Sequence, residues 1–439
     1  MSYRSASNRP TFSLSLIATA MAIPLSLTAV TTASAKDVNT DEVTSQQVVN
    51  HYADLAYATY TDALQAAKNL DAAIDNLLAD PTTETLKAAR LAWLQARIPY
   101  QQSEAFRFGN PVVDDWEGQL NAWPLDEGLI DYVAQEGYQH ELGNAGATAN
   151  IIASKQINIG GETIDVSEIT PELLASLNEI GGSEANVASG YHAIEFLLWG
   201  QDLNGYQSGA GQRPASDYAK GENCTNGNCD RRGDYLSAAS SLLISDLEWM
   251  TNQWSAESDN NYRQELLAEP AEEGLRRMLF GIGSLSLGEL AGERMKVALE
   301  ANSYEDEHDC FSDNTHNSHF YNGQGIHNIY SGHYQRLDGT ALDGPSLADL
   351  LSQQNAELAE TLNQQMDASM MALGELKKHA EADESPMAFD MMIAPGNDTG
   401  ATLINNAIMA LVNQTGSIEK AAGELGVNSL APDTAGHNF

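Results

Sequence analysis

A histidine and a glutamate three residues apart, His192 and Glu195, are the side chains in this sequence best suited to chemistry. They lie in a stretch with helical periodicity, where residues three apart project from the same face. One imidazole nitrogen and one carboxylate oxygen from a single turn make half of a metal site suited to iron, zinc or manganese. Gly190, just before them, has no side chain and lets a neighbouring helix approach closely. Spacing alone leaves an alternative, a core histidine beside a solvated glutamate, because His-x-x-Glu pairs are common.

Two further groups of side chains have the composition of metal ligands. Histidines are dense in one irregular stretch, at His308, His316, His319, His327 and His333. They form either a second metal-binding surface or a plain solvated loop. The thioether sulfur that copper(I) prefers is frequent later in the chain, at Met366, Met370, Met371, Met387, Met391 and Met392. The helical spacing of the first three methionines favours a core stripe over a copper site.

Helices must position these side chains, because apolar residues recur at steps of three and four through most of the sequence. One such stripe runs from Ala56 to Leu77. Asp80 and Pro81 predict the start of a second helix with Asp80 as its N-cap, and this helix should be kinked by Pro99 and end near 109–111. A third helix is expected over 183–199. The segment 157–166 predicts a short hairpin around two glycines.

The segment 203–232 lacks this periodicity and is rich in Gly, Ser and Asn. We interpret it as a connection between domains, since helical stripes resume over 236–254, 275–299, 351–373 and from 403 onwards. The predicted fold class is therefore all-α, with two tandem four-helix bundles at 36–202 and 233–439 and a functional site at their interface.

The first 35 residues predict a cleaved signal peptide. Arg4 and Arg9 precede an apolar stretch over 11–30, and Ala33 and Ala35 supply the small residues before a cleavage site. An uncleaved membrane anchor is the alternative, which the proline at position 24 and the cleavage pattern disfavour. The mature protein is thus expected in the periplasm or elsewhere in the cell envelope.

Charge and cysteine usage narrow the choice of partners. The chain has 22 basic and 61 acidic residues, a net charge of −39, so it repels phosphate backbones and no nucleic-acid partner is expected. Cys224 and Cys229 are close enough in sequence to form a disulfide in an exported protein. Cys310 has no evident partner and is expected to be a free, buried thiol.

Several blocks of the sequence resemble one family. The stretch from Ser189 to Asp202 is similar to the GxHxxE signature of the imelysin-like proteins. Segments 97–109, 123–126 and 130–132 resemble the first bundle of that family. Segments 288–295 and 309–316 resemble its iron-regulated protein A subgroup. These blocks are spread over most of the mature chain.

The resemblance implies two helical bundles with a functional site between them, in a protein associated with bacterial iron uptake. Glu104 and Asp126 match polar blocks of the family and are the best candidates to complete the metal site of His192 and Glu195. Arg97 is expected to orient a carboxylate, because a guanidinium has no lone pair to give a metal. From the second bundle, the residues that could reach the interface are Glu289, Glu293, Asp313 and His316. For Glu293 a salt bridge with a nearby arginine is an equal alternative.

Iron is the metal that the resemblance favours, with zinc and copper as alternatives, and a membrane iron-transport component is the expected protein partner. The rival function is an envelope metallopeptidase, as some family members have been described. A zinc peptidase commonly uses His-Glu-x-x-His or its inverse, and here Phe196 follows Glu195 without a second histidine. We therefore rank metal binding above hydrolysis. A third possibility is a binding module for haem or an organic anion.

Overall fold

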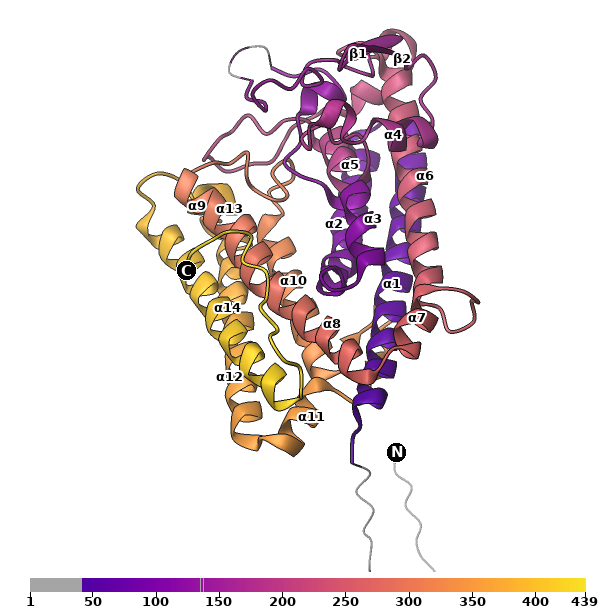
Figure 1. The fold of residues 1–439 in the computed structure, drawn as a ribbon. Coiled ribbons are helices and arrows are strands. Elements are labelled where there is room, and N and C mark those ends of the chain that lie inside the picture. The colour runs from indigo at the N-terminus through magenta and orange to yellow at the C-terminus, as the bar shows by residue number, and fades with distance from the viewer. Residues whose placement is uncertain (1–41, 135, 137) are drawn as a thin grey trace, which may run out of the picture. The chain divides into compact units, whose positions relative to one another are not determined.

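Long helices make up most of the residues that the computed structural model describes, which are 42–134, 136 and 138–439 (Figure 1). The predicted all-α class is confirmed, since the only strands in these residues form two small hairpins. The predicted signal peptide lies outside the described residues. The residues from Val43 to Phe439 form one compact unit.

The helices before residue 203 include the one that bears His192. They are α1 (Ser45–Ala79), α2 (Thr83–Ser103), the 3₁₀ turn η1 (Glu104–Phe106), α3 (Pro111–Asn121), the 3₁₀ turn η2 (Glu127–Leu129), α4 (Pro171–Leu177), the 3₁₀ turn η3 (Ile180–Gly182) and α5 (Gly190–Trp199). The predicted hairpin is present as β1 (Gln156–Ile159) and β2 (Glu162–Asp165), which pair antiparallel with Ile157 opposite Ile164.

The elements after residue 203 include a second, smaller hairpin. They are the 3₁₀ turns η4 (Ala215–Tyr218) and η5 (Gly221–Asn223), α6 (Cys229–Trp254), α7 (Tyr262–Ala268), α8 (Ala271–Ser284), the π-helix η6 (Leu285–Val297), α9 (Ala298–Ala301), α10 (Thr315–Ser331), β3 (His333–Gln335), β4 (Ala341–Asp343), α11 (Leu347–Gln354), α12 (Ala356–Ala380), α13 (Phe389–Met392) and α14 (Asp398–Glu424). The predicted helix over 275–299 corresponds to α8, η6 and α9, which follow one another without a break.

Two predicted helix starts are wrong, for local reasons. The N-cap of α2 is Thr82, not Asp80. The Thr82 hydroxyl accepts a hydrogen bond from the Thr85 amide, and the Thr85 hydroxyl accepts one from the Thr82 amide. Helix α5 begins at Gly190 and not at residue 183, because Ser189 is extended and the segment before it is held in turns. The predicted stripe from Ala56 to Leu77 is buried as expected.

Packing joins the helices into two groups (Figure 1). Helix α1 packs along α2 and α6, and α5 packs between α2 and α6, which together form much of the larger apolar core. Helix α14 packs along α12 and η6 around a second, smaller core. Helix α10 contacts α2 on one side and α12 on the other, so it connects the two groups. Helix α6 begins inside the last residues of the segment 203–232, yet it packs with the helices before that segment. The proposed domain boundary stays a prediction.

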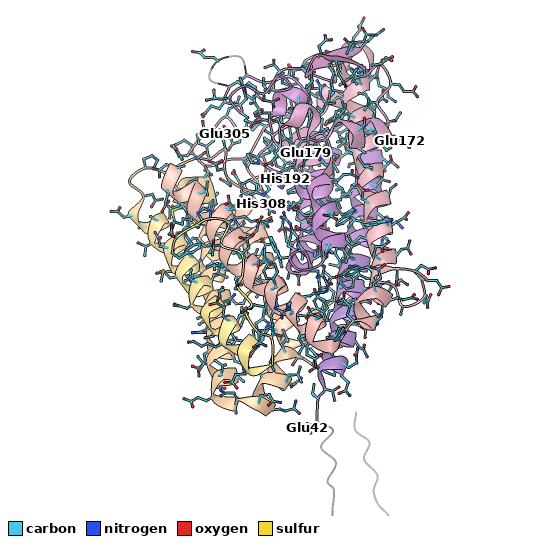
Figure 2. The ribbon with its side chains drawn as sticks, viewed as in Figure 1. Glu42, Glu172, Glu179, His192, Glu305 and His308 are labelled. Carbon is cyan, nitrogen blue, oxygen red and sulfur yellow. A yellow bond between two sulfur atoms is a disulfide. The ribbon has the colours of Figure 1, made fainter. Side chains whose placement is uncertain are left out.

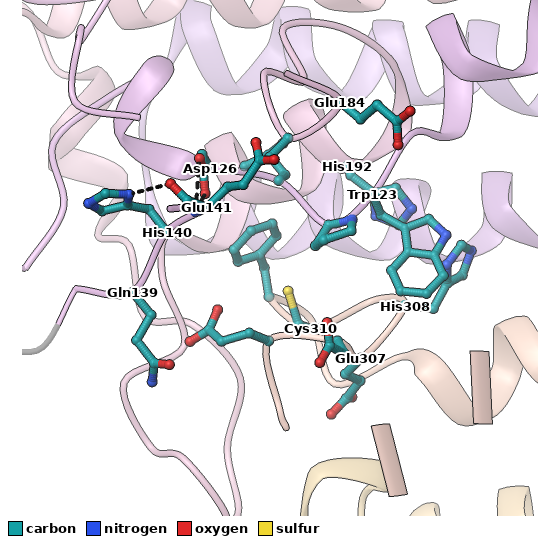
Figure 3. A pocket seen from close by; sticks show the side chains of 16 residues that line it. Trp123, Asp126, Gln139, His140, Glu141, Glu184, His192, Glu307, His308 and Cys310 are labelled. Atoms are coloured by element: carbon teal, nitrogen blue, oxygen red, sulfur yellow. Dashed lines mark hydrogen bonds between the residues drawn. The ribbon is translucent and has the colours of Figure 1, made fainter. Parts of the chain in front are cut away.

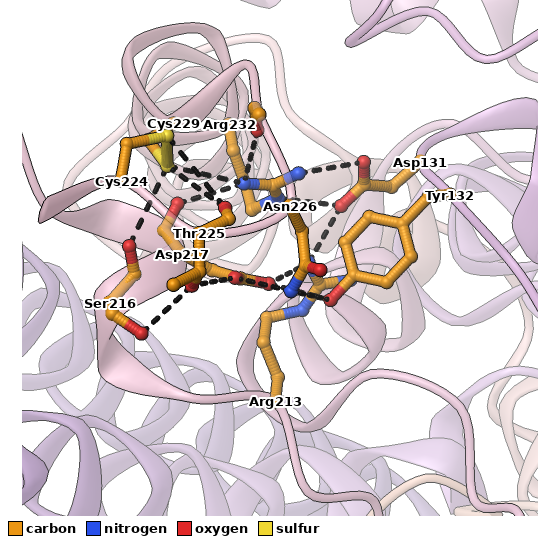
Figure 4. The surroundings of a disulfide bond; sticks show 11 residues. Asp131, Tyr132, Arg213, Ser216, Asp217, Cys224, Thr225, Asn226, Cys229 and Arg232 are labelled. Atoms are coloured by element: carbon orange, nitrogen blue, oxygen red, sulfur yellow. Dashed lines mark hydrogen bonds and ion pairs between the residues drawn. A yellow bond between two sulfur atoms is a disulfide. The ribbon is translucent and has the colours of Figure 1, made fainter. Parts of the chain in front are cut away.

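The segment 203–232 is anchored by a disulfide and a buried charge network (Figure 4). Cys224 and Cys229 form a disulfide with their Cα atoms 5.9 Å apart. Beside it, Arg232 donates from two nitrogens to the Asp131 carboxylate at 2.6 and 3.1 Å, and Arg213 donates to the same carboxylate at 2.7 Å. These contacts fix the segment against the loop that follows α3.

Candidate metal centre

The first turns of α5 bring His192 and Glu195 into the interior, where both are buried. Gly190 allows this placement. Its φ is +80°, and a Cβ atom there would lie 2.3 Å from the backbone oxygen of Leu120 at the end of α3. The missing side chain therefore lets α5 lie directly against α3, the close approach that the sequence suggests.

His192 and Glu195 contact each other, and their contact decides which imidazole nitrogen remains available. His192 Nδ1 lies 2.9 Å from Glu195 Oε2. His192 Nε2 is buried and has no hydrogen-bond partner among the described residues. Burial, with Arg97 adding to it, lowers the pKa of His192 to about 3, so the imidazole is neutral at physiological pH. A neutral imidazole with one nitrogen held by a carboxylate is the usual state of a metal-binding histidine.

Glu195 has both oxygens engaged. Its Oε2 faces His192, while its Oε1 accepts from the Ser312 amide at 2.9 Å and from the Ser312 hydroxyl at 2.6 Å. Burial and then the nearby Asp309 raise the pKa of Glu195 well above its usual value. A buried carboxyl in this situation is stabilised as an anion by added positive charge. Its position makes Glu195 the group that orients His192.

A second histidine, His308, lies against His192 from the loop between α9 and α10. His192 and His308 are labelled in Figure 2, and their rings meet edge to face with centroids 4.9 Å apart. The Trp123 ring also packs edge to face on His308, with centroids 5.0 Å apart. His308 Nε2 lies 3.3 Å from the side-chain amide of Gln101, whose oxygen faces Arg97 and His308, and His308 Nδ1 has no partner in the described part of the chain. Burial lowers the pKa of His308 well below its usual value.

Asp309 completes a group of three. One ligand atom each from His192, His308 and Asp309 lie within 4.8 Å of one another. Arg97 in α2 donates to Asp309 Oδ1 at 2.7 Å, and Asn314 donates to Oδ2 at 2.8 Å. Although burial raises the pKa of Asp309, the Arg97 charge outweighs it and holds this pKa below its usual value. Asp309 is therefore an anion, and Arg97 orients a carboxylate as the sequence predicts.

The imidazoles are reached from a cavity of about 390 Å³ (Figure 3). His192 and His308 form part of its wall together with Trp123 and Cys310. The carboxylates in the wall are those of Asp126, Glu141, Glu184, Glu305, Asp306 and Glu307. Such a wall attracts cations toward the two histidines.

Glu104 and Asp126 are not among the three residues whose ligand atoms converge. Glu104 is buried in η1, where its Oε2 accepts from Arg294 Nη2 at 2.6 Å. Asp126 lines the cavity, but its carboxylate accepts from the Glu141 amide at 3.0 Å and from the Asn144 side chain at 2.6 Å.

The other residues that the sequence predicts near the site are Glu289, Glu293, His316 and Asp313. Glu289 pairs with Arg294 at 2.8 Å, and Glu293 faces His437 near the C-terminus at 2.9 Å. His316 at the start of α10 lies 3.5 Å from Glu381. Asp313 is half-buried, with burial raising its pKa to about 7.

His308 and Asp309 are the residues that sequence reasoning does not assign as ligands. The sequence places His308 among five histidines in an irregular stretch, and Asp309 only at the start of a resembling block. The local signal was two adjacent ligand-type residues, but only the fold shows that this loop meets α5. In addition, none of the described helices is long and apolar enough to cross a membrane.

Comparison with known proteins identifies the family. Iron-regulated protein A of Synechococcus elongatus is 24% identical over 350 residues, which cover 78% of each chain. The fold matches the crystal structure of an iron-regulated protein A precursor from Parabacteroides distasonis, with a TM-score of 0.61 and 20% identity over 90% of this chain and 97% of that one. It also matches an imelysin-like protein from Psychrobacter arcticum, with a TM-score of 0.56 and 15% identity over 87% of this chain and 96% of that one. The family model described as Imelysin matches residues 56–418, and the chain therefore belongs to the imelysin family.

Proposed function

We propose that this protein binds iron through His192, His308 and Asp309 as a step in bacterial iron uptake. The observation that carries the proposal is the pair of buried imidazole nitrogens, His192 Nε2 and His308 Nδ1, that have no partner among the described residues. Leaving two such polar atoms buried is costly unless something binds them. Two imidazoles with one carboxylate are a ligand set typical of ferrous iron.

The family and its members support an iron-related role. The relative from Synechococcus elongatus carries the name iron-regulated protein A. The ligand chemistry adds the metal type, since neutral nitrogen donors beside one anionic oxygen suit iron better than calcium or magnesium. Zinc also accepts this ligand set, so the metal must be tested by competition.

Glu195 and Arg97 have supporting roles in this proposal. Glu195 holds His192 by its Nδ1 so that Nε2 is presented, and Arg97 holds Asp309. Iron supplies the positive charge that the Glu195 carboxylate otherwise lacks. The sequence predicts Glu195, Glu104 and Asp126 as ligands. In this proposal Glu195 instead orients His192, Glu104 is the ion-pair partner of Arg294, and Asp126 is part of the cavity wall.

The experiment is an anaerobic titration of purified protein with ferrous iron, repeated with zinc and copper. We expect one site, lost in His192→Ala and in His308→Ala while both variants keep the helical circular dichroism of the wild type. Equal iron binding by wild type and both variants, with lower melting temperatures in the variants, would show that the two histidines are only core residues.

Export to the periplasm and a membrane iron-transport partner belong to the same proposal. The charge pattern of residues 1–35 supports export. Intact mass of envelope protein should begin at Lys36 or within a few residues of it, and Met1 retained in a membrane fraction would contradict this localisation. Crosslinking in iron-starved cells should capture an envelope transport component, and it should do so more weakly from cells grown in excess iron.

A peptidase remains the rival proposal, and a direct assay separates it. If the protein hydrolysed peptides, it would cleave an unfolded substrate, and both a chelator and Glu195→Gln would abolish the cleavage. We expect the wild-type protein to cleave the substrate no faster than Glu195→Gln does.

A further inference from the structure

A second cavity, smaller than the first, adjoins the wall that carries His308. Its volume is about 10 Å³, which is room for about one water or ion. We call it the acidic cavity, because five carboxylates line it: Glu127, Asp202, Glu305, Glu307 and Asp390. They come from η2, the segment after α5, the loop between α9 and α10, and α13. Side chains from four separate segments therefore converge on one small space.

Two of these carboxylates are buried without the partners that buried anions need. Glu307 and Asp390 are each 2% exposed. Glu307 Oε1 and both carboxylate oxygens of Asp390 have no hydrogen-bond partner among the residues described. None of the five carboxylates forms an ion pair with a basic side chain in the described part of the chain, whereas Asp309 nearby has Arg97. A buried carboxylate normally has such a partner or binds a cation.

The electrostatics of the acidic cavity point the same way. Burial, with the charge of Asp202 adding to it, raises the pKa of Asp390 to about 7, although the backbone amide of Met391, which is close but not in hydrogen-bond geometry, opposes the shift. Burial followed by the charge of Glu127 raises the pKa of Glu305 to about 8. Each carboxylate disfavours the ionisation of its neighbours, because like charges repel. A cation among them would offset this repulsion.

We propose that the acidic cavity binds a hard divalent cation of the calcium class, at a site separate from the imidazoles of the iron site. Every charged donor in its wall is an oxygen, which calcium takes six to eight at a time and which softer metals do not prefer. The thiol of Cys310 also borders the cavity, but burial raises its pKa and keeps it a neutral, poor ligand.

Calcium in the acidic cavity has a structural consequence for the iron site. Glu305 and Glu307 belong to the loop that carries His308 and Asp309, while Asp390 belongs to α13 and Asp202 to the segment after α5. A cation held by all of them ties that loop to α13 and to the segment after α5. Occupancy thus fixes the loop that completes the iron site.

The test is calcium binding by the full chain after treatment with a chelator. Calcium should bind one to one by calorimetry and raise the melting temperature by several degrees. Terbium, a luminescent calcium substitute, should show emission sensitised by Tyr304 in the cavity wall and reversed by calcium. No calcium binding together with no terbium emission overturns the proposal.

Variants locate the site. Asp390→Asn keeps the shape of the side chain and should weaken calcium binding at least tenfold, and Glu307→Gln should do the same. The matched control is Asp383→Asn, which removes the same charge from an exposed position seven residues away and should bind like wild type. Calcium binding that is equal in wild type, Asp390→Asn and Glu307→Gln contradicts the site.

The outcome of the calcium titration does not depend on the proposed iron function. His192→Ala should lose iron but keep calcium affinity within about threefold, because His192 does not line the acidic cavity. Loss of calcium binding in His192→Ala would show instead that the two cavities form one site, which overturns the proposal of separate sites. Failure of iron binding in wild type leaves the calcium titration unaffected.

Discussion

The buried polar residues around Arg294 and those around His192 and His308 differ in one respect, which is whether their polar atoms have hydrogen-bond or ion-pair partners. Around Arg294, Glu104 accepts at 2.6 Å, Glu289 at 2.8 Å and the Asn322 side chain at 2.7 Å. All the guanidinium nitrogens of Arg294 have partners. Around His192 and His308, by contrast, one nitrogen of each ring lacks a partner among the described residues.

The difference teaches how to separate structure from function among buried polar residues. A group that satisfies itself, such as Arg294 with its carboxylates, needs no ligand and holds helices together. A group that is oriented but left with free lone pairs, as His192 is by Glu195, is prepared for a ligand. Sequence reasoning combined Glu104 with His192 in one metal site, whereas the structure gives Glu104 to the self-satisfied group.

The largest expected effect is a loss of stability when the ion pairs of Arg294 are removed. Arg294→Met keeps much of the side-chain volume but leaves Glu104 without its ion-pair partner and Glu289 with only the longer ion pair to Arg107 at 3.6 Å. Because Arg294 is fully buried, we expect a loss of about 3–5 kcal/mol in the free energy of unfolding. Urea denaturation measures it. The exposed pair of Lys378 and Glu375 is the control, and Lys378→Met should cost less than about 1 kcal/mol. Similar losses in the two variants would contradict the comparison.

The second effect is on iron affinity. His192→Ala should lower it by more than the roughly 10–100-fold that loss of an orienting residue produces, because a donor atom is removed. Glu104→Gln is the matched test of the other group and should change iron affinity less than about threefold. Titration of both with ferrous iron decides whether Glu104 belongs to the site. If Glu104→Gln loses iron as strongly as His192→Ala, the separation of the two groups is wrong.

The helices and the Cys224–Cys229 pair could be predicted from the sequence, because periodicity and short spacing are local signals. A family motif made His192 a candidate ligand, which stays a prediction. The partners of His192 could not be predicted. His308 is 116 positions away in an irregular loop, and its approach depends on how α10 packs against α2. Glu104 and Arg294 are even farther apart, at 190 positions, so the sequence offers no sign that an arginine pairs with this predicted ligand.

The third effect tests the role of Glu195. Glu195→Gln keeps an oxygen or nitrogen beside His192 Nδ1 but removes the negative charge. We expect iron affinity to fall by about 10–100-fold, as for other residues that orient a metal-binding histidine. Glu195→Asp, which keeps the charge but shortens the reach, should retain more affinity than Glu195→Gln if charge matters most. Affinity lost as completely as in His192→Ala would show that Glu195 is itself a ligand.

The last expected effect is that of pH on iron binding. Protons compete with metal for an imidazole only near or below its pKa. Burial and the charge of Arg97 lower the pKa of His192 to about 3, and burial lowers that of His308 as well. Two ordinary histidines with a pKa of about 6.5 would together lose on the order of 1,000-fold in affinity between pH 7 and pH 5. Here both rings stay neutral over that range, and the only proton that iron displaces is that of the buried Glu195 carboxyl, whose pKa is raised. Iron affinity in anaerobic ferrous titrations at pH 7, 6 and 5 should therefore weaken by no more than about tenfold per pH unit, as expected for loss of one proton, with circular dichroism showing that the protein is folded at each pH. A steep loss of affinity, approaching a hundredfold per pH unit below pH 6, would mean that iron binds to exposed histidines and not to this buried pair.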